Sequence, residues 1–347
     1  MRNITTVGID LAKLVFQVHG IDARGKVTLR KQLKRSQVVT FFAQLAPCLI
    51  GMEACAGAHF WSGKLVEFGH TVKLIAPQFV KPYVKTNKND AADAEAICEA
   101  VGRPNMRFVP IKNTEQQALM GLHRARQGFV GARTAQANQV RGLLAEFGLV
   151  MPAGIRCIER KLPEVLQDAD NGLSDASRAL FARLLEHFRV LDRQVEELER
   201  EIGAWHREDS ASRRLQAIPG IGPITASALV ASVGDAKVFH NGRQFAAWLG
   251  LVPRQRSSGG KTNLQGISKR GDTYLRTLLI HGARSVLLSL KRDPARADGW
   301  LAHVANRRNP NIAAVALANK NARTVWALLA HGREYQAGYR SANAMAA

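Results

Sequence analysis

The first 80 residues alternate between strand-like and helix-like patterns of hydrophobic positions. In chain order they predict strands at 5–9, 14–19 and 26–31, a helix at 38–45, a strand at 48–52, a helix at 60–68 and a strand at 71–75. A turn-forming Asp-Ala-Arg-Gly sequence at 22–25 joins the second strand to the third. Since helices and strands alternate after an antiparallel start, we predict an α/β domain built on one mixed sheet.

The middle of the chain has a helical pattern that is interrupted once. A helix is predicted from Thr114 to about residue 147, and Thr114 with Gln117 is typical of a capping box. Its basic residues predict either a core-packing helix with solvated charges or a contact with a nucleic-acid backbone; they are Arg124, Arg126, Arg133 and Arg141. Residues 148–174 are broken by Pro and Gly and predict a linker.

A heptad pattern follows this predicted linker. Its apolar residues are Leu184, Phe188, Leu191, Val195, Leu198, Ile202 and Trp205, at spacings of three and four. The pattern predicts either a helical hairpin within the chain or a seam between two copies, and we favour a protein partner or self-association. The acidic sequence VEELERE at its centre argues against direct binding of nucleic acid.

The part of the chain after residue 209 is predicted to be mainly helical. Within 215–233, a helix, the turn Pro219-Gly220-Ile221-Gly222 and a second helix form the helix-hairpin-helix pattern. Glycines allow the backbone to approach a phosphate, and the amides that open the second helix point toward it. We therefore expect Gly220 and Gly222 to contact a DNA or RNA backbone, with an ordinary turn as the alternative. Two more helices are predicted at 274–290 and 312–329.

These patterns divide the chain into four parts. They are an α/β domain at 1–148, a linker with coiled-coil helices at 149–209, a mainly α domain at 210–335 and a disordered tail at 336–347.

The charge of the chain indicates a polyanionic partner. Lys and Arg number 49 against 28 Asp and Glu, which gives a formal net charge of +21 in 347 residues. The last 97 residues hold 16 Lys or Arg and only 4 Asp or Glu, so more than half of the excess lies there. Clustering of this kind favours a nucleic-acid surface over a general effect on solubility.

The cysteine pattern and the lengths of the apolar runs indicate the cellular location of the protein. Four cysteines, Cys48, Cys55, Cys98 and Cys157, have neither CxxC spacing nor a nearby His pair, so we expect neither a zinc site nor disulfides. No apolar run approaches the roughly 18 residues that span a bilayer, and the N-terminus lacks the apolar region of a signal peptide. We expect a cytoplasmic protein without membrane contact.

Four acidic residues are candidates for a metal site. Asp10 falls at the end of the first predicted strand and Glu53 at the end of the fourth, and strand ends converge in such a sheet. Asp90 and Asp93 lie three apart in a helical sequence and so share one helix face. Carboxylate oxygens bind hard cations that neutralise a scissile phosphate, so we predict a Mg²⁺ or Mn²⁺ site; surface acids are the alternative.

The sequences around these acids resemble a known family. VGIDLAK, GMEACAG and NKNDAADAEAI resemble, in order and spacing, the Asp, Glu, Asp, Asp motifs of the DEDD-type transposases of bacterial insertion sequences. The resemblance implies an RNase H-like fold similar to that of RuvC-type Holliday-junction resolvases. It also implies that Asp10, Glu53, Asp90 and Asp93 are catalytic acids that bind magnesium.

A basic Ser-Ser-Gly-Gly sequence is the second candidate site. Ser257 and Ser258 precede two glycines and stand in a cluster of cationic residues that could hold a phosphate: Arg254, Arg256, Lys261, Lys269 and Arg270. A nucleophilic serine also needs a base, and none is visible in this sequence, so it has to come from elsewhere in the fold. A flexible surface loop is the alternative.

The C-terminal sequence extends the resemblance to nearly the whole chain. GLVPRQRSSGGKTNLQGISKRGDTYLR is similar to the C-terminal domain of the same transposases, which are thought to form a covalent phosphoserine link to DNA. The position directly before Gly259 implies that Ser258 is the nucleophile, with Ser257 as the other possibility. The acids are expected to supply the missing base and charge neutralisation.

The resulting prediction is a DNA transposase or recombinase that excises and inserts a mobile element. The resemblance further implies a guide RNA encoded by the element, and holding two duplexes implies a homodimer or tetramer. Two alternatives stay open: a metal-dependent, resolvase-like nuclease in which Ser258 is not catalytic, and a nucleic-acid-binding protein without catalysis.

Overall fold

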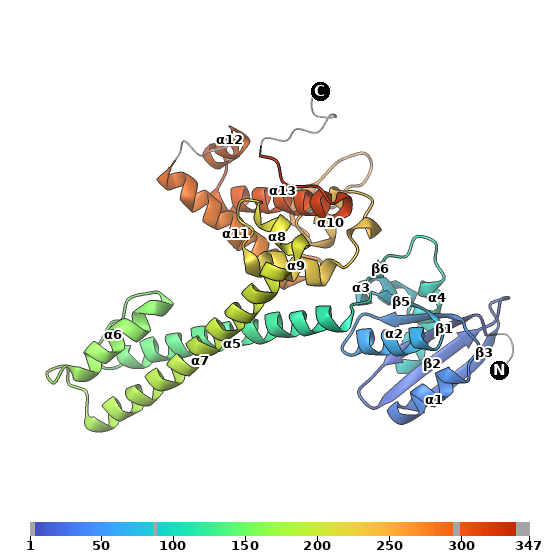
Figure 1. Ribbon diagram of the computed structural model, residues 1–347, viewed down its shortest axis with the longest axis horizontal. Coiled ribbons are helices and arrows are strands. Elements are labelled where there is room, and N and C mark those ends of the chain that lie inside the picture. Colours follow the sequence, from blue (N-terminus) through green and yellow to red (C-terminus); the bar gives the residue numbers. More distant parts are fainter. Residues whose placement is uncertain (1–3, 86–88, 294–298, 338–347) are drawn as a thin grey trace. The chain divides into compact units, whose positions relative to one another are not determined.

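The computed structural model describes residues 4–85, 89–293 and 299–337. The chain forms two compact units, Met1–Gln116 and Gln117–Ala347, which are treated separately below (Figure 1). The tail predicted to be disordered lies, from residue 338 onward, outside the described residues.

Unit 1 is built on a six-stranded sheet with the strand order β3-β2-β1-β4-β5-β6. Its strands are β1 Thr6–Leu11, β2 Val15–Ile21, β3 Val27–Lys34, β4 Leu49–Glu53, β5 Thr71–Ile75 and β6 Phe108–Val109. Its helices are α1 Val38–Ala43, α2 Ala58–Glu67, α3 Pro77–Val80 and α4 Asp90–Val101. β1, β4 and β5 are parallel, whereas β2, β3 and β6 pair antiparallel with their neighbours. The predicted mixed sheet is confirmed, and its topology is consistent with an RNase H-like fold.

The two faces of this sheet differ because side chains alternate along each strand. One face carries Val7, Ile9, Phe16, Val18 and Ile50, which form a core with residues of α1 and α2. Helix α4 packs on the other, which we call the α4 face.

Two glycines allow α4 to lie close to the sheet. A Cβ atom on Gly8 would overlap the backbone of Ala94 and Cys98, and one on Gly51 would lie 2.7 Å from Cβ of Val101. Because any side chain at Gly8 or Gly51 would push the helix away, these glycines set the distance between α4 and the strand ends.

Unit 2 begins with a long helical hairpin. Helices α5 Thr114–Ala145 and α7 Asp175–Glu208 run antiparallel, with ion pairs from Arg126 to Glu199 and from Arg133 to Asp192. Apolar residues of both helices share two clusters along this length. The heptad pattern of α7 is therefore covered within the same chain, by α5 together with α6 and α9, which is the intramolecular one of the two alternatives.

Three details of this hairpin differ from expectation. Residues 155–167 of the predicted linker form helix α6 Ile155–Gln167, which buries Ile158 and Leu162 against α7 even though Pro163 lies inside it. The capping box consists of Asn113 and Gln116, which bond each other's backbone N–H, and not of Thr114 and Gln117. Arg141 donates to the carbonyls of Pro152 and Gly154, so it joins Arg126 and Arg133 in a structural role.

A mainly helical domain completes unit 2. Its elements are α8 Ser210–Gln216, α9 Pro223–Val233, α10 Gly242–Trp248, β7 Pro253–Gln255, β8 Leu264–Ile267, α11 Thr273–Arg292, α12 Gly299–Arg307 and α13 Pro310–His331. One core, which includes Leu229, Phe245, Leu279 and Leu317, joins these helices. In the described ranges, no helix is both long and apolar enough to cross a membrane.

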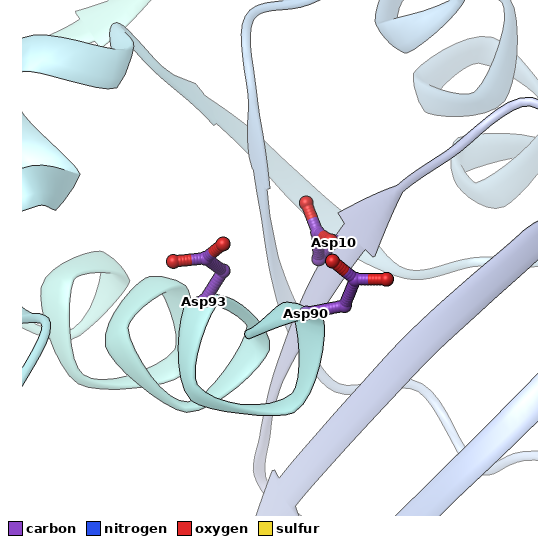
Figure 2. Close-up of side chains that lie close together, drawn as sticks. All are labelled: Asp10, Asp90 and Asp93. Carbon is purple, nitrogen blue, oxygen red and sulfur yellow. The ribbon is translucent and has the colours of Figure 1, made fainter. Parts of the chain in front are cut away.

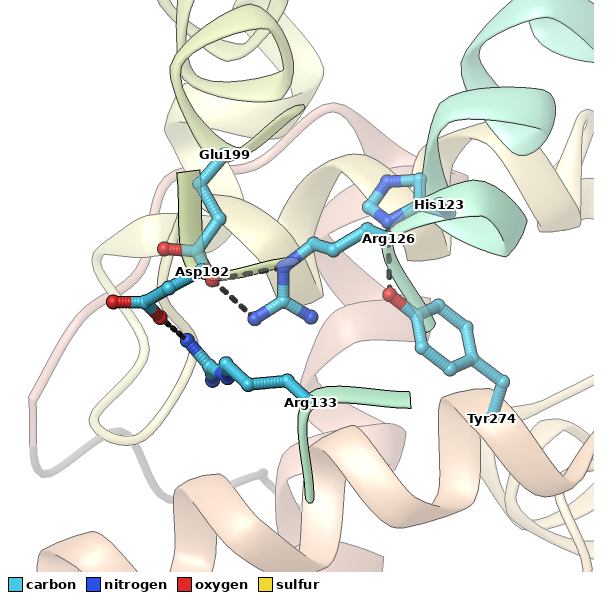
Figure 3. A network of polar contacts seen from close by, with 6 residues as sticks. All are labelled: His123, Arg126, Arg133, Asp192, Glu199 and Tyr274. Carbon is cyan, nitrogen blue, oxygen red and sulfur yellow. Dashed lines mark hydrogen bonds and ion pairs between the residues drawn. The ribbon is translucent and has the colours of Figure 1, made fainter. Parts of the chain in front are cut away.

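A polar network fastens α5 to this domain (Figure 3). Ser227 of α9 donates its hydroxyl hydrogen to the carbonyl of Pro223 at 2.7 Å, so its oxygen accepts from Nε2–H of His123 at 3.1 Å. Nδ1 of His123 then accepts from the Tyr274 hydroxyl at 3.0 Å. Burial, aided by the charge of Arg126, lowers the pKa of His123 to about 4, which keeps the ring neutral.

The lowered pKa of His123 predicts that the folded protein loses stability in acid. Because its folded pKa lies below the ordinary 6.5, the unfolded chain takes up the proton first as the pH falls. The contribution of neutral His123 to the free energy of unfolding is complete above about pH 6.5. It is lost as the pH falls toward 4, at about 1.4 kcal/mol for each pH unit. We expect His123→Gln to lower stability at pH 7.5 and to reduce the further loss at pH 5 by roughly 2 kcal/mol.

Urea unfolding at the two pH values measures this difference. His187→Gln, at an exposed position of α7, is the matched control and should leave the pH dependence unchanged. An equal acid-induced loss in His123→Gln and in the unmodified protein would contradict a neutral, buried His123.

Candidate active site

Three of the four predicted acids meet at one end of the sheet in unit 1. Asp10 lies near the end of β1, and Asp90 and Asp93 lie in the first turn of α4, where Asn89 caps the helix by accepting from the Ala92 N–H. Each contributes a carboxylate oxygen to a group whose members all lie within 4.8 Å of one another (Figure 2). The close approach of α4 at Gly8 brings the start of the helix to Asp10, two residues further along β1.

Glu53 lies at the same end of the sheet but outside this group of three. It is the last residue of β4. Met52 of β4 is paired with Ile9 of the parallel strand β1, and Glu53 and Asp10 are the residues that come directly after this pair on the two strands. The thiol of Cys55 is close to both: burial raises its pKa, and the charges of Glu53 and Asp10 raise it further.

The three grouped aspartates fit a divalent cation. Mg²⁺ binds oxygen ligands at about 2.1 Å, so ligands on opposite sides of the ion are about 4.2 Å apart, and the three carboxylate oxygens lie within 4.8 Å of one another. Three carboxylates this close repel one another unless a cation or protons intervene. The donor set is entirely oxygen, which suits Mg²⁺ or Mn²⁺.

The two serines lie in a β-hairpin of unit 2 formed by β7 and β8. Ser258 and Lys261 are bridge partners, and the Lys261 N–H donates to the Ser258 carbonyl at 3.1 Å. Between them, Gly259 and Gly260 both have positive φ, of 55° and 76°. This is the geometry of a tight two-residue hairpin turn that only glycine-like residues adopt readily. The Ser-Ser-Gly-Gly sequence is thus a defined turn and not an irregular loop.

The two serine hydroxyls differ in their contacts. Oγ of Ser257 accepts from Nε2 of Gln255 at 2.9 Å and from the Asn263 N–H at 3.3 Å. The side chain of Ser258 is exposed and makes no hydrogen bond to another residue in the described part of the chain. Of the two, the Ser258 hydroxyl is therefore the one available to an incoming phosphate.

The predicted cations surround this turn in sequence and are all exposed. Among the described residues none of the five takes part in an ion pair: Arg254, Arg256, Lys261, Lys269 and Arg270. Their charges are consequently available to an anionic ligand.

The base of the serine hairpin is held by features that the sequence analysis missed. Gly250 and Gly271 both have positive φ, and Cβ atoms there would overlap the carbonyl oxygens of Arg270 and Trp248. The buried side chain of Arg276 donates from Nη1 to the carbonyls of Leu249 and Arg270, both at 3.2 Å. One guanidinium on α11 therefore fastens both ends of the hairpin. The two isolated glycines were the available signal in the sequence.

The helix-hairpin-helix arrangement is present, but its glycines have different surroundings. A Cβ atom on Gly220 would lie 2.8 Å from the Gly282 carbonyl oxygen, and Asn321 donates to the Pro219 carbonyl at 2.9 Å. Gly220 is thus required for packing on α11. Gly222 is exposed, with open space around it at the start of α9, and can still receive a backbone phosphate.

An acid-bearing mixed-sheet unit followed by a helical unit with a cationic serine hairpin defines a class of enzymes that act on nucleic-acid phosphates. Comparison with known families agrees with this class. Residues 7–148 match the transposase model of the DEDD type of IS110, and residues 212–298 match the model of the IS116/IS110/IS902 family of transposases.

Similar proteins cover almost the whole chain. A probable family 20 transposase of Pseudomonas aeruginosa is 54% identical over 337 residues, 97% of this chain and 100% of the relative. The transposase for insertion sequence element IS1328 of Yersinia enterocolitica is 45% identical, over 96% of this chain and 98% of the relative. The transposase for IS1111A of Coxiella burnetii is 45% identical, over 97% and 93%. The chain belongs to the IS116/IS110/IS902 family and is a transposase, an enzyme of phosphoryl transfer on DNA.

The Arg276 contacts predict that loss of this guanidinium loosens the serine hairpin. Hydrogen bonds from a charged donor contribute about 1.5–3 kcal/mol each, so we expect Arg276→Met to lower the free energy of unfolding by about 2–3 kcal/mol. Trypsin should then cleave near Arg254, Arg256 and Lys261 at least about tenfold faster, and transposition should fall by a similar factor.

Arg284→Met is the matched control, because Arg284 lies on the same helix and is exposed. Added guanidinium should partly restore transposition by Arg276→Met. Unchanged proteolysis of the hairpin in Arg276→Met would show that this side chain does not hold it.

Proposed function

We propose that this transposase excises and inserts its element by forming a phosphoserine link between Ser258 and DNA. The observation that carries the proposal is the contrast between the two serines. The Ser258 hydroxyl is exposed at a two-residue turn and is close in sequence to the exposed cations Arg254, Arg256 and Lys261, whereas the Ser257 hydroxyl accepts two hydrogen bonds within the hairpin. A positioned nucleophile with cations around it is the arrangement that phosphoryl transfer needs.

The proposed reaction exchanges one phosphodiester for another. Oγ of Ser258 loses its proton and attacks a DNA phosphorus atom, and the bond from phosphorus to the leaving sugar oxygen breaks. That oxygen takes up a proton and becomes a hydroxyl. A sugar hydroxyl of the strand to be joined then attacks the phosphoserine, releases Ser258 and restores its proton. Since the number of phosphoester bonds is unchanged, no external energy source is required.

The basic residues of the hairpin stabilise the charge of this reaction. Arg254, Arg256 and Lys261 are close in sequence to Ser258 and can donate to the non-bridging oxygens of the phosphate. Lys269, Arg270 and the open backbone at Gly222 can hold neighbouring phosphates without reading the sequence.

The acids of unit 1 are proposed to bind Mg²⁺ or Mn²⁺ through Asp10, Asp90 and Asp93, with Glu53 beside them. The cation, when bound, supplies charge neutralisation and promotes loss of a proton from an oxygen nucleophile. The aspartates hold it in place, and Asn89 and Gly8 fix the start of α4 so that two of them face the third.

A nuclease of the resolvase type is the second candidate. It is favoured by the fact that the three aspartates form a compact oxygen site within unit 1 alone. In that case the acids would cut DNA by hydrolysis and Ser258 would take no part in the chemistry.

Serine substitutions distinguish these two functions. We expect Ser258→Ala to form no denaturant-stable protein–DNA adduct and to lower transposition in cells by at least about a thousandfold, since the nucleophile is absent. Ser257→Ala, which removes two hydrogen bonds from the same hairpin, should still form the adduct at a reduced rate. Adduct formation is measured by electrophoresis in denaturant. An adduct formed by Ser258→Ala would contradict the assignment.

An RNA guide and a dimer or tetramer are also proposed. The net charge of +21 and the family resemblance support an RNA partner, and the joining of two duplexes supports more than one subunit. Bacterial relatives and action on chromosomal DNA support a cytoplasmic location.

Removal of RNA tests the guide. Protein purified after complete RNase digestion should lose recombination of its element DNA, and adding back RNA transcribed from the element should restore it. A transcript of unrelated sequence is the control. Equal recombination before and after digestion would exclude an RNA guide.

A further inference from the structure

The part of the α4 face beside Asp10 carries polar residues that have no role in the proposed reaction. In the register of the sheet, Asp10 of β1 is paired with Gln17 of β2, and Gln17 with Gln32 of β3. Two residues further along β2, His19 is paired with Arg30 of β3. Paired residues share a face, so these four side chains continue the surface of the acidic cluster across β2 and β3.

A cavity of about 410 Å³ lies on this surface, within unit 1. It is lined by Gln17, His19, Arg30 and Gln32 from the strands and by Asn89 and Glu95 from the start of α4, among others. Its volume falls within the range of about 300–1,000 Å³ that is usual for small-molecule sites. The strands contribute mainly polar residues to its lining, whereas the helix side combines Asn89 and Glu95 with Ala91, Ala92 and Ala94.

Three polar side chains that line this cavity make no hydrogen bond to another described residue. His19 is only 4% exposed, and neither its ring nor the amides of Gln17 and Gln32 make a hydrogen bond to another described residue. The His19 ring and the two amides are therefore available to a ligand in the cavity. Arg30 is paired with Glu95 only loosely, at 3.7 Å and with both side chains exposed.

We infer that this cavity binds the nucleotides that flank the phosphate held at the acids, on the DNA strand being processed. The inference rests on the proposed function of the acidic cluster. Amide and imidazole groups both donate and accept, as base edges and sugars require, and a guanidinium suits a phosphate. Strands lie about 4.8 Å apart, so Gln32 is about 10 Å from Asp10. At about 3.4 Å for each nucleotide of duplex DNA, the surface spans two or three nucleotides.

The chain offers a charge-matched control for this surface. Lys31 lies between Arg30 and Gln32 on β3 and also borders the cavity, but its charged Nζ is on the opposite face of the sheet, 5.1 Å from the centre of the Phe41 ring. Arg30→Ala and Lys31→Ala each remove one positive charge from neighbouring exposed positions. They differ in whether the charge faces the cavity.

The test measures binding of full-length protein to a labelled DNA duplex that carries the element's end, over a range of salt concentrations. Arg30→Ala should weaken binding about three- to tenfold and reduce the slope of log K against log salt by about 0.9, the value for one phosphate contact. The double variant Gln17→Ala with Gln32→Ala should weaken binding without changing the slope. Both should lower transposition in cells at least about tenfold. Lys31→Ala should stay within about twofold in every measurement.

Thermal unfolding confirms that each variant is folded, as expected for changes at exposed or half-buried positions. Equal effects of Arg30→Ala and Lys31→Ala would overturn the inference, because general charge would then explain both. So would loss of binding to an RNA probe with unchanged binding to DNA.

The variant Asp10→Asn distinguishes failure of the cavity assignment from failure of the proposed role of the acids, on which that assignment rests. If Asp10→Asn abolishes transposition while the cavity variants bind and transpose normally, only the cavity assignment is wrong. If Asp10→Asn transposes normally, the proposed role of the acids fails.

Discussion

Close contact between backbones at glycine positions determines where the functional groups of this protein lie. Gly8 and Gly51 allow α4 to approach the sheet, and Asp10 and Glu53 follow them by two residues on the same face. A strand rises about 3.3 Å per residue and a helix about 1.5 Å. Two strand residues therefore match four or five helix residues. This places the start of α4, with Asp90 and Asp93, opposite Asp10.

Close backbone contacts at glycine positions also occur in unit 2. Gly220 packs on Gly282, and Gly250 and Gly271 pack on the carbonyls of Arg270 and Trp248. In each case a side chain would separate two segments that are distant in sequence. The guanidinium of Arg276 adds hydrogen bonds to the second of these contacts, so the serine hairpin has a fixed base beneath an exposed turn. If Ser258 is the nucleophile proposed above, a fixed base reduces the entropy lost when it meets its substrate.

Most of unit 1 could be predicted from the sequence because its signals are local. The period-two pattern gave the first five strands to within a few residues, and the spacing of Asp90 and Asp93 gave their common helix face. Helix α6 was missed because Pro163 and the neighbouring glycines outweighed the helical spacing of Ile158 and Leu162. The choice between Ser257 and Ser258 needed the structure, since it depends on hydrogen bonds across the hairpin. The fixed base of that hairpin could not be predicted either, because Gly250 contacts Arg270, 20 positions later, and Arg276 bonds Leu249, 27 positions earlier.

The helical hairpin limits how copies of this chain can associate. The apolar stripe of α7 is already covered by α5, α6 and α9, and the ion pairs of Arg126 and Arg133 fix the register of α5 and α7. Exposing this stripe to a second copy would uncover partly buried charges as well as apolar surface, at a cost of several kcal/mol. An assembly of intact hairpins must therefore use other surfaces, and a coiled coil between subunits would require α5 to be exchanged between copies and not merely joined.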